Sequence, residues 1–180
     1  MFSIYILFIT PFIILAYMVF YYSWKKNPQN FYPKNRPLLF GHRGSPTHIT
    51  ENTIRSFEKA IDQRVDGIEF DIRLSKDKKI IIFHDSTLQR LANVDKKIKT
   101  QTYAQLQEHL LTNQEKIARL EDILPLLKKV KALNIEIKTD GILQGQEIIK
   151  PLLHFIVKHN INDKCIISSF NPLILWRIKV

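Results

Sequence analysis

The chain opens with an uninterrupted apolar segment. Residues 2–24 contain no charged side chain and consist mostly of Ile, Leu, Phe, Val and Tyr. A helix of about 20 apolar residues is long enough to span a bilayer. Because no helical register of the segment presents a polar face, the pattern predicts a transmembrane anchor over residues 1–24 rather than a buried helix of a soluble domain.

The end of this segment predicts how it would lie in a membrane. Tyr21, Tyr22 and Trp24 are placed as an interfacial aromatic belt, and Lys25 and Lys26 follow directly. Basic residues favour the cytoplasmic side, and the uncharged N-terminus argues against a cleaved signal peptide. We therefore expect a single-pass membrane protein with a proline-containing linker over residues 25–37 and a cytoplasmic domain over residues 38–180.

Beyond the linker, short apolar runs alternate with longer segments of helical period, which is typical of an α/β fold with a mainly parallel sheet. The predicted strands are residues 38–41, 67–74, 80–83, 134–138 and 165–169. Helices are expected after Asn52, which can cap one, after a capping box of Thr102 and Gln105, and over residues 124–130 and 144–158. Residues 75–78 are too few for a crossover helix, so the second and third strands should form an antiparallel hairpin.

Two of the predicted strands carry charged residues on one face. Glu69 and Asp71 point the same way from the second strand, and Glu136 and Lys138 repeat this spacing on the fourth. Buried carboxylates require a cation or a hydrogen-bond network, and three of them without a thiolate favour a hard cation such as Mg²⁺ or Ca²⁺. The alternative is that these acids are half-exposed and pair with Arg73 or Lys138, and the pattern alone favours neither.

Two histidines follow predicted strands. His42, Arg43 and Gly44 come just after the first strand, where barrel active sites are built, and an arginine can bind phosphate with two hydrogen bonds. His84, followed by Asp85, ends the third strand. Since imidazole titrates near neutral pH, the two histidines could be the base and acid of a hydrolysis. The other histidines are expected to be structural.

Six short motifs extend this picture over most of the chain. They are residues 41–44, 51–53, 67–72 with 75–77, 83–85, 136–138 and 168–170. In this order they resemble the glycerophosphodiester phosphodiesterase family, whose fold is a TIM-type (β/α)8 barrel. Such a barrel needs about 250 residues, whereas we predict only about five strands. The resemblance therefore implies a C-terminally truncated chain that holds the N-terminal part of the barrel, which a partner chain or an oligomer could complete.

The resemblance also implies roles for individual residues. Glu69, Asp71 and Glu136 would ligate a divalent metal cation, Mg²⁺ or Ca²⁺. The other implied roles are general acid and base for His42 and His84, phosphate binding for Arg43 and Lys138, and support of the site near the metal for Glu51. The expected reaction, in glycerophospholipid metabolism, is hydrolysis of a glycerophosphodiester to sn-glycerol 3-phosphate and an alcohol.

Three other functions stay open. The first is a lysophospholipase D-type reaction on lysophospholipids, which a membrane anchor would favour. The second is a related phospholipase of the phosphoinositide or sphingomyelin type, although the motifs at 136–138 and 51–53 favour the first family. The third is an inactive remnant that another chain would have to complete.

Composition narrows the range of partners. Lys and Arg outnumber Asp and Glu by 27 to 17, for a formal net charge of +10, but they are scattered along the chain. This distribution indicates solubility or attraction to anionic membranes and phosphates, and not nucleic-acid binding. Cys165 is the single cysteine, so no intramolecular disulfide can form.

Overall fold

The computed structural model describes residues 2–22, 35–47 and 49–179. The described residues form two compact units, the first containing helix α1 (Phe2–Tyr22) and the second containing the described residues from 35 to 178. The predicted linker, residues 25–37, lies outside the described residues up to residue 34.

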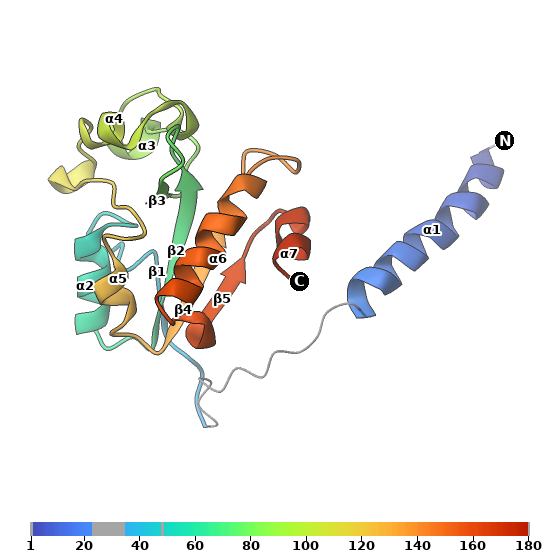
Figure 1. Ribbon diagram of the computed structural model, residues 1–180, viewed down its shortest axis with the longest axis horizontal. Helices are drawn as coiled ribbons and strands as arrows, with labels where there is room; N and C mark the ends of the chain where they lie inside the picture. Colours follow the sequence, from blue (N-terminus) through green and yellow to red (C-terminus); the bar gives the residue numbers. More distant parts are fainter. Residues whose placement is uncertain (1, 23–34, 48, 180) are drawn as a thin grey trace. The chain divides into compact units, whose positions relative to one another are not determined.

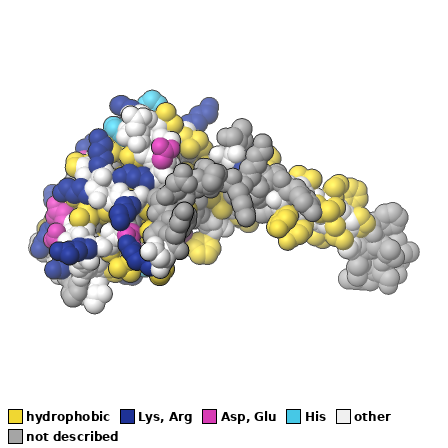
Figure 2. All heavy atoms as spheres, turned by 90° about the horizontal axis from the view of Figure 1, so that it is seen from below, with side chains coloured by type: hydrophobic (Ala, Val, Ile, Leu, Met, Phe, Trp, Pro, Cys, Tyr) yellow, Lys and Arg dark blue, Asp and Glu magenta, His cyan; other side chains and the backbone are white. Residues whose placement is uncertain are grey.

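Helix α1 coincides with the predicted apolar helix and is 21 residues long, with Pro11 inside it. Its exposed side chains between Ile9 and Tyr21 are mostly large and hydrophobic, as the yellow spheres of Figure 2 show. In the part of the chain that the structure describes, however, no helix is both long enough and apolar enough to cross a membrane. The prediction of a helix is confirmed here, and the prediction of a transmembrane anchor over residues 1–24 is not supported.

The second unit is an α/β fold (Figure 1). Its strands are β1 (Phe40–His42), β2 (Gly67–Leu74), β3 (Ile80–Ile82), β4 (Ala132–Ile137) and β5 (Cys165–Ser168). Its α-helices are α2 (Ile54–Asp62), α3 (Gln89–Ala92), α4 (Tyr103–Gln107), α5 (Leu124–Leu127), α6 (Ile149–Lys158) and α7 (Pro172–Ile178). Short 3₁₀ helices are Ile98–Thr100, Thr112–Gln114, Gln146–Ile148 and Asn162–Lys164.

The sheet is mainly parallel, as predicted. Strands β1, β2, β4 and β5 lie side by side in this order and pair in parallel. Strand β3 pairs with the end of β2 and runs antiparallel to it, because the connection after Leu74 is too short for a crossover. Of the five predicted barrel strands, four therefore follow the parallel path, and β3 forms a hairpin beside it.

One face of the sheet is covered by helices. Ile68, Phe70 and Ile72 of β2 point to this face, and their partners on β4 are Leu133, Ile135 and Ile137. These buried residues form one hydrophobic core with side chains of α2, α5, α6 and α7. Since neighbouring residues of a strand point to opposite faces, burial of this set directs Glu69, Asp71 and Glu136 to the other face.

The segment between β3 and α5 has a small core of its own. Ile81 and Phe83 pack there against buried side chains from the following loops and short helices, including Leu88, Ile98 and Leu106. The predicted capping box starts α4: the Thr102 hydroxyl accepts from the backbone N–H of Gln105, whose side chain accepts in return. Figure 1 shows α3 and α4 beyond the carboxyl end of β2, next to the polar face of the sheet.

Charge is distributed over the surface of this unit. Lys and Arg side chains are scattered over the face in Figure 2 and do not gather in one block. This view agrees with the scattered basic residues of the sequence.

Candidate active site

The polar face of the sheet brings the predicted residues together by strand register. His42 of β1 pairs with Glu69 of β2, and Asp71 pairs directly with Glu136 of β4. Lys138 follows β4 on the same face. The sequence pattern predicts the face of the sheet to which each residue points. The strand register adds which residues of the three strands are neighbours on that face.

Three carboxylates converge at the centre of this face. Glu69, Asp71 and Glu136 each offer an oxygen atom, and these atoms lie within 4.8 Å of one another. Asp71 is fully buried and Glu69 is 7% exposed, and the buried Oδ1 of Asp71 lacks a hydrogen-bond partner of good geometry. Buried, clustered oxygen ligands are what a hard divalent cation requires, so the residues fit the metal that the sequence predicts.

Two basic side chains partly compensate the carboxylates. The Nζ atom of Lys138 lies 3.2 Å from Oδ1 of Asp71 and 2.6 Å from Oε1 of Glu136. Nε of Arg43 lies 3.2 Å from Oδ2 of Asp71. With all three carboxylates ionised, these five residues carry a net charge of −1. A divalent cation would change it to +1, which suits an anionic phosphodiester.

Burial and neighbouring charge affect Glu69 most strongly. Burial, and then the negative charge of Asp71, raise the pKa of Glu69 to about 7, against a lowering contribution from the backbone N–H of Arg43. The shift follows mainly from burial, and a bound cation would favour the ionised form of this carboxyl. This observation agrees with a site that holds a cation.

The loop after β1 is held in an uncommon conformation. Arg43 has a φ of 56°, and its N–H donates to the carbonyl and the carboxylate of Glu69 at 3.0 Å and 2.9 Å. Gly44 has a φ of 89°, and a Cβ atom there would lie 2.7 Å from the carbonyl oxygen of Ser56. A side chain at position 44 is therefore excluded, and the turn directs the guanidinium of Arg43 back to Asp71.

Asn52 is a site residue that the sequence analysis missed. Its side-chain amide donates to Oδ2 of Asp71 at 2.8 Å, and its Oδ1 accepts from the backbone N–H of Asp71 at 3.2 Å. The predicted helix cap at this position is wrong by one residue, because the Thr53 side chain caps α2 by accepting from Ser56. Asn52 instead has a φ of 58°, a conformation that Asn tolerates, and this frees its side chain to fix Asp71.

The two predicted catalytic histidines lie at the border of the carboxylate cluster. The imidazole of His42 is 68% exposed, and its Nε2 lies 3.7 Å from Oε2 of Glu69. His84 is half-buried, and its Nδ1 lies 2.6 Å from Oδ1 of Asp85. The carbonyl of His84 accepts from Nε of Arg73 at 2.9 Å, which ties the end of β3 to β2.

Glu51 lies beside the carboxylate cluster and not within it. Its carboxylate pairs with Arg43 at 3.0 Å and with Arg90 at 2.6 Å, and Arg90 also contacts Asp85 at 2.7 Å. Burial raises the pKa of Glu51, but the hydrogen bonds and charges of Arg90 and Arg43 outweigh it and hold this pKa below its usual range. Glu51 therefore supports the site through Arg43. Arg90 belongs to α3, where no sequence motif indicated it.

A hollow of about 460 Å³ opens beside Glu136, at one edge of the carboxylate cluster. Its lining includes His84 and Asp85 from the end of β3, Glu136 and Lys138 from β4, and Phe170 after β5. His84 thus faces the same space as one carboxylate and one cation of the cluster. The arrangement combines a candidate cation site, fixed positive charges and an imidazole around a space for a small ligand.

Comparison with known proteins identifies relatives of this arrangement. The model of the glycerophosphoryl diester phosphodiesterase family matches residues 42–180. A glycerophosphodiester phosphodiesterase of Caldanaerobacter subterraneus is 32% identical over 152 residues, which cover 80% of this chain and 62% of the relative. The chain thus spans less than two thirds of that protein.

Two solved structures share the fold. A glycerophosphodiester phosphodiesterase of Thermotoga maritima is 35% identical, with a TM-score of 0.63 over 78% of this chain and 57% of that one. A phosphodiesterase of Oleispira antarctica, solved in complex with the product sn-glycerol-3-phosphate, is 29% identical, with a TM-score of 0.72 over 79% of this chain and 61% of that one. These likenesses support the TIM-barrel-like α/β fold with a parallel sheet.

Proposed function

The chain belongs to the glycerophosphoryl diester phosphodiesterase family, and from this premise we propose that its polar sheet face is a centre for glycerophosphodiester hydrolysis. The products would be sn-glycerol 3-phosphate and an alcohol. The observation that carries the proposal is the convergence of Glu69, Asp71 and Glu136 within 4.8 Å, next to the cations of Arg43 and Lys138. The product bound by the Oleispira relative is the one that this reaction would release.

A divalent cation, Mg²⁺ or Ca²⁺, is part of the proposal. Glu69, Asp71 and Glu136 would hold it, because they supply clustered oxygen atoms without a thiolate or a neutral imidazole. When bound, such a cation polarises a phosphoryl oxygen and neutralises charge that develops in the transition state. The fit of the carboxylates supports the cation as a class and does not distinguish the two ions.

Arg43 and Lys138 would bind the substrate phosphate. Each contacts a different oxygen of Asp71, so their positions are fixed before a substrate arrives. Their side chains are 18% and 13% exposed, and charges in such partly buried positions interact strongly with an anionic ligand. Preorganised positive charge of this kind favours the transition state of phosphoryl transfer.

His42 and His84 would move the protons. When Nδ1 of His84 carries a proton, it donates to the carboxylate of Asp85. Nε2 of the same ring is then left for proton exchange with the substrate or water. His42 has an exposed ring beside Glu69, where a leaving alcohol or an attacking water has access. One imidazole would take a proton from water and the other would protonate the alcohol.

Release of glycerol 3-phosphate from glycerophosphocholine tests this function. The purified chain is assayed with Mg²⁺, with Ca²⁺ and with a chelator. The histidine substitutions are His42→Ala and His84→Ala, and His154→Ala is the matched control because His154 is exposed on α6. We expect cation-dependent release that falls by a factor of about 10² to 10⁴ in the first two variants only. Equal rates in all variants would contradict the assignment.

The lipid substrate and the cellular location stay predictions. A lysophospholipid substrate and a cytoplasmic membrane location both depended on the predicted anchor, for which the described part of the structure offers no support. Assaying lysophosphatidylcholine beside glycerophosphocholine would separate the lipid reaction from the soluble one.

A further inference from the structure

A chain of connected hollows leads from the carboxylate cluster along the sheet. The hollow of about 460 Å³, which Glu136 of the cluster lines, adjoins two others, of about 430 and 380 Å³. Arg73, Ser86 and Thr139 line all three hollows. The three hollows therefore form one continuous groove. The smallest of the three hollows, called the basic groove below, is lined by Arg73, Ser86, Lys97, Lys99, Thr139, Asp140 and Gln144.

Arg73 connects the basic groove with the carboxylate cluster. It follows Asp71 by two residues on β2, so it lies on the same face about 7 Å further along the strand. Its side chain is 13% exposed. Nε donates to the carbonyl of His84 at 2.9 Å and Nη1 donates to Oδ1 of Asp140 at 2.8 Å. The guanidinium is therefore fixed at one end of the groove.

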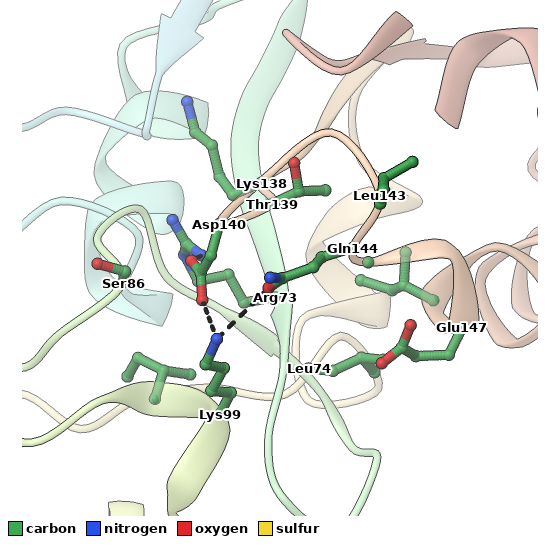
Figure 3. Close-up of a pocket in the computed structure, with 13 residues that line it drawn as sticks. Arg73, Leu74, Ser86, Lys99, Lys138, Thr139, Asp140, Leu143, Gln144 and Glu147 are labelled. Atoms are coloured by element: carbon green, nitrogen blue, oxygen red, sulfur yellow. Dashed lines mark hydrogen bonds and ion pairs between the residues drawn. The ribbon is translucent and has the colours of Figure 1, made fainter. Parts of the chain in front are cut away.

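Two lysines add to this charge from the opposite wall. Nζ of Lys99 lies 3.2 Å from Oδ2 of Asp140 and donates to Oε1 of Gln144 at 3.4 Å. Figure 3 shows Lys99 pointing toward Asp140, whereas Lys138 points away from it. Lys97 lines the same space, and its ammonium has no ion pair with any residue that the structure describes. The basic groove thus has three cations and a single carboxylate.

The lining also argues against a cationic ligand. A quaternary ammonium is recognised by aromatic rings or by acids, and neither of the two further hollows has an aromatic residue in its lining. Asp140 is already shared by Arg73 and Lys99. Glu147, in the larger of the two hollows, pairs with Lys78 at 3.2 Å. The excess positive charge is left for an anion.

We infer that the substrate carries a second anionic group, a carboxylate or a phosphate, which binds at Arg73, Lys97 and Lys99 while the phosphodiester lies at the carboxylate cluster. This inference rests on the proposed function and specifies its substrate class. A strand spacing of about 7 Å between the two positions suits groups separated by only a few bonds. Choline-type substrates would lack this contact.

Two matched substrate pairs test the inference. Glycerophosphoserine differs from glycerophosphoethanolamine by one carboxylate, and glycerophosphoinositol 4-phosphate differs from glycerophosphoinositol by one phosphate. We expect kcat/KM to be about tenfold higher for the anionic member of at least one pair at low salt, and the preference to shrink as salt screens it. The pair that shows the preference identifies the anion. Equal kcat/KM within both pairs would overturn the inference.

Substitutions then locate the preference. The double variant Lys97→Met and Lys99→Met removes two charges and keeps the apolar stems, and we expect the preference to fall to about twofold or less. Lys129→Met is the matched control, because Lys129 is an exposed lysine that does not line the groove. The same loss of preference in the control, or none in the double variant, would contradict the assignment.

Binding separates this inference from the proposed function. If no substrate of either pair is hydrolysed, the proposed function fails. Calorimetry then tests the inference without turnover, by comparing the binding affinities of O-phosphoserine and O-phosphoethanolamine. We expect about tenfold tighter binding of O-phosphoserine to the unmodified chain and similar binding of both compounds to the double lysine variant. Equal affinities of the unmodified chain within this pair, and also within a second pair of inositol 1,4-bisphosphate and inositol 1-phosphate, would overturn the inference.

Discussion

Asp71 and Glu136 face each other as paired residues of the parallel strands β2 and β4, and Nζ of Lys138 lies within 3.2 Å of the first and 2.6 Å of the second. Two like charges directly opposite each other destabilise a sheet. The lysine therefore stabilises a pair of acids that hydrophobic packing alone would not retain. The same three residues form one side of the candidate active site.

Replacing Lys138 with Met should destabilise the chain in the presence of a chelator. Breaking such a partly buried charge pair costs about 3 kcal/mol in the free energy of unfolding. A divalent cation should restore part of this loss, because it would neutralise the same acids. Urea unfolding with chelator and with Ca²⁺ measures both values, and an equal loss in the two conditions would argue against a cation at this site.

Asn52 offers a test of how Asp71 is held. Asn52→Gly keeps the positive φ and removes the amide, and we expect it to cost about 2 kcal/mol because Asp71 loses two hydrogen bonds. Asn52→Ala should cost about 1 kcal/mol more through backbone strain. Thermal or urea unfolding measures the difference. Two variants as stable as the original chain would show that Asn52 does not hold Asp71.

The raised pKa of Glu69 predicts a pH dependence in chelator. Its pKa is raised from 4.5 to about 7, so the folded chain binds this proton more tightly than the unfolded chain. The associated stability is present at low pH and is lost as pH rises through this window. As pH rises from 5 to 8, Glu69→Gln should therefore become increasingly stable relative to the original chain. Urea unfolding at several pH values would show this trend.

Glu58→Gln is the control for this comparison, since Glu58 is exposed on α2. Its side chain lies outside the carboxylate cluster, so the variant controls for the loss of one surface carboxylate. A Glu69→Gln variant that behaves like this control would show that Glu69 is not the group with the raised pKa.

Asp66 predicts the opposite pH dependence at the start of β2. A hydrogen bond from Arg36, and then one from the backbone of Leu39, lower the pKa of Asp66 far below its usual range. The stability that this carboxylate contributes is present above its unfolded pKa of about 4 and decreases as pH falls below it. Asp66→Asn should be less stable than the original chain at pH 7, with a difference that shrinks below about pH 4. A difference that is constant with pH would contradict this.

The sequence was most informative where one local rule decides the structure. Alternation along a strand was sufficient to place Glu69 and Asp71 on one face, because the period of a strand is fixed. The five-residue connection between Leu74 and Ile80 was sufficient to predict the β2–β3 hairpin. The capping box at Thr102 likewise depends only on residues three positions apart.

Residues that depend on tertiary contacts were not predictable in this way. Arg90 contacts Glu51 across 39 positions of the chain, and Asp140 contacts Arg73 across 67 positions. A local sequence pattern cannot predict contacts between residues so far apart. Asn52 was assigned as a cap because Asn commonly has this role. Its positive φ, which shifts the cap to Thr53, follows from the packing of the loop against Asp71.

The most direct test of the carboxylate cluster as the catalytic centre is glycerol 3-phosphate release from glycerophosphoethanolamine by three proteins: the original chain, Glu69→Gln and Glu58→Gln. Each is assayed with saturating Mg²⁺ or Ca²⁺ after circular dichroism has shown that it is folded. The account predicts that Glu69→Gln lowers kcat/KM by at least about a hundredfold and that Glu58→Gln does not change it. Activity in the original chain that survives Glu69→Gln unchanged would contradict it.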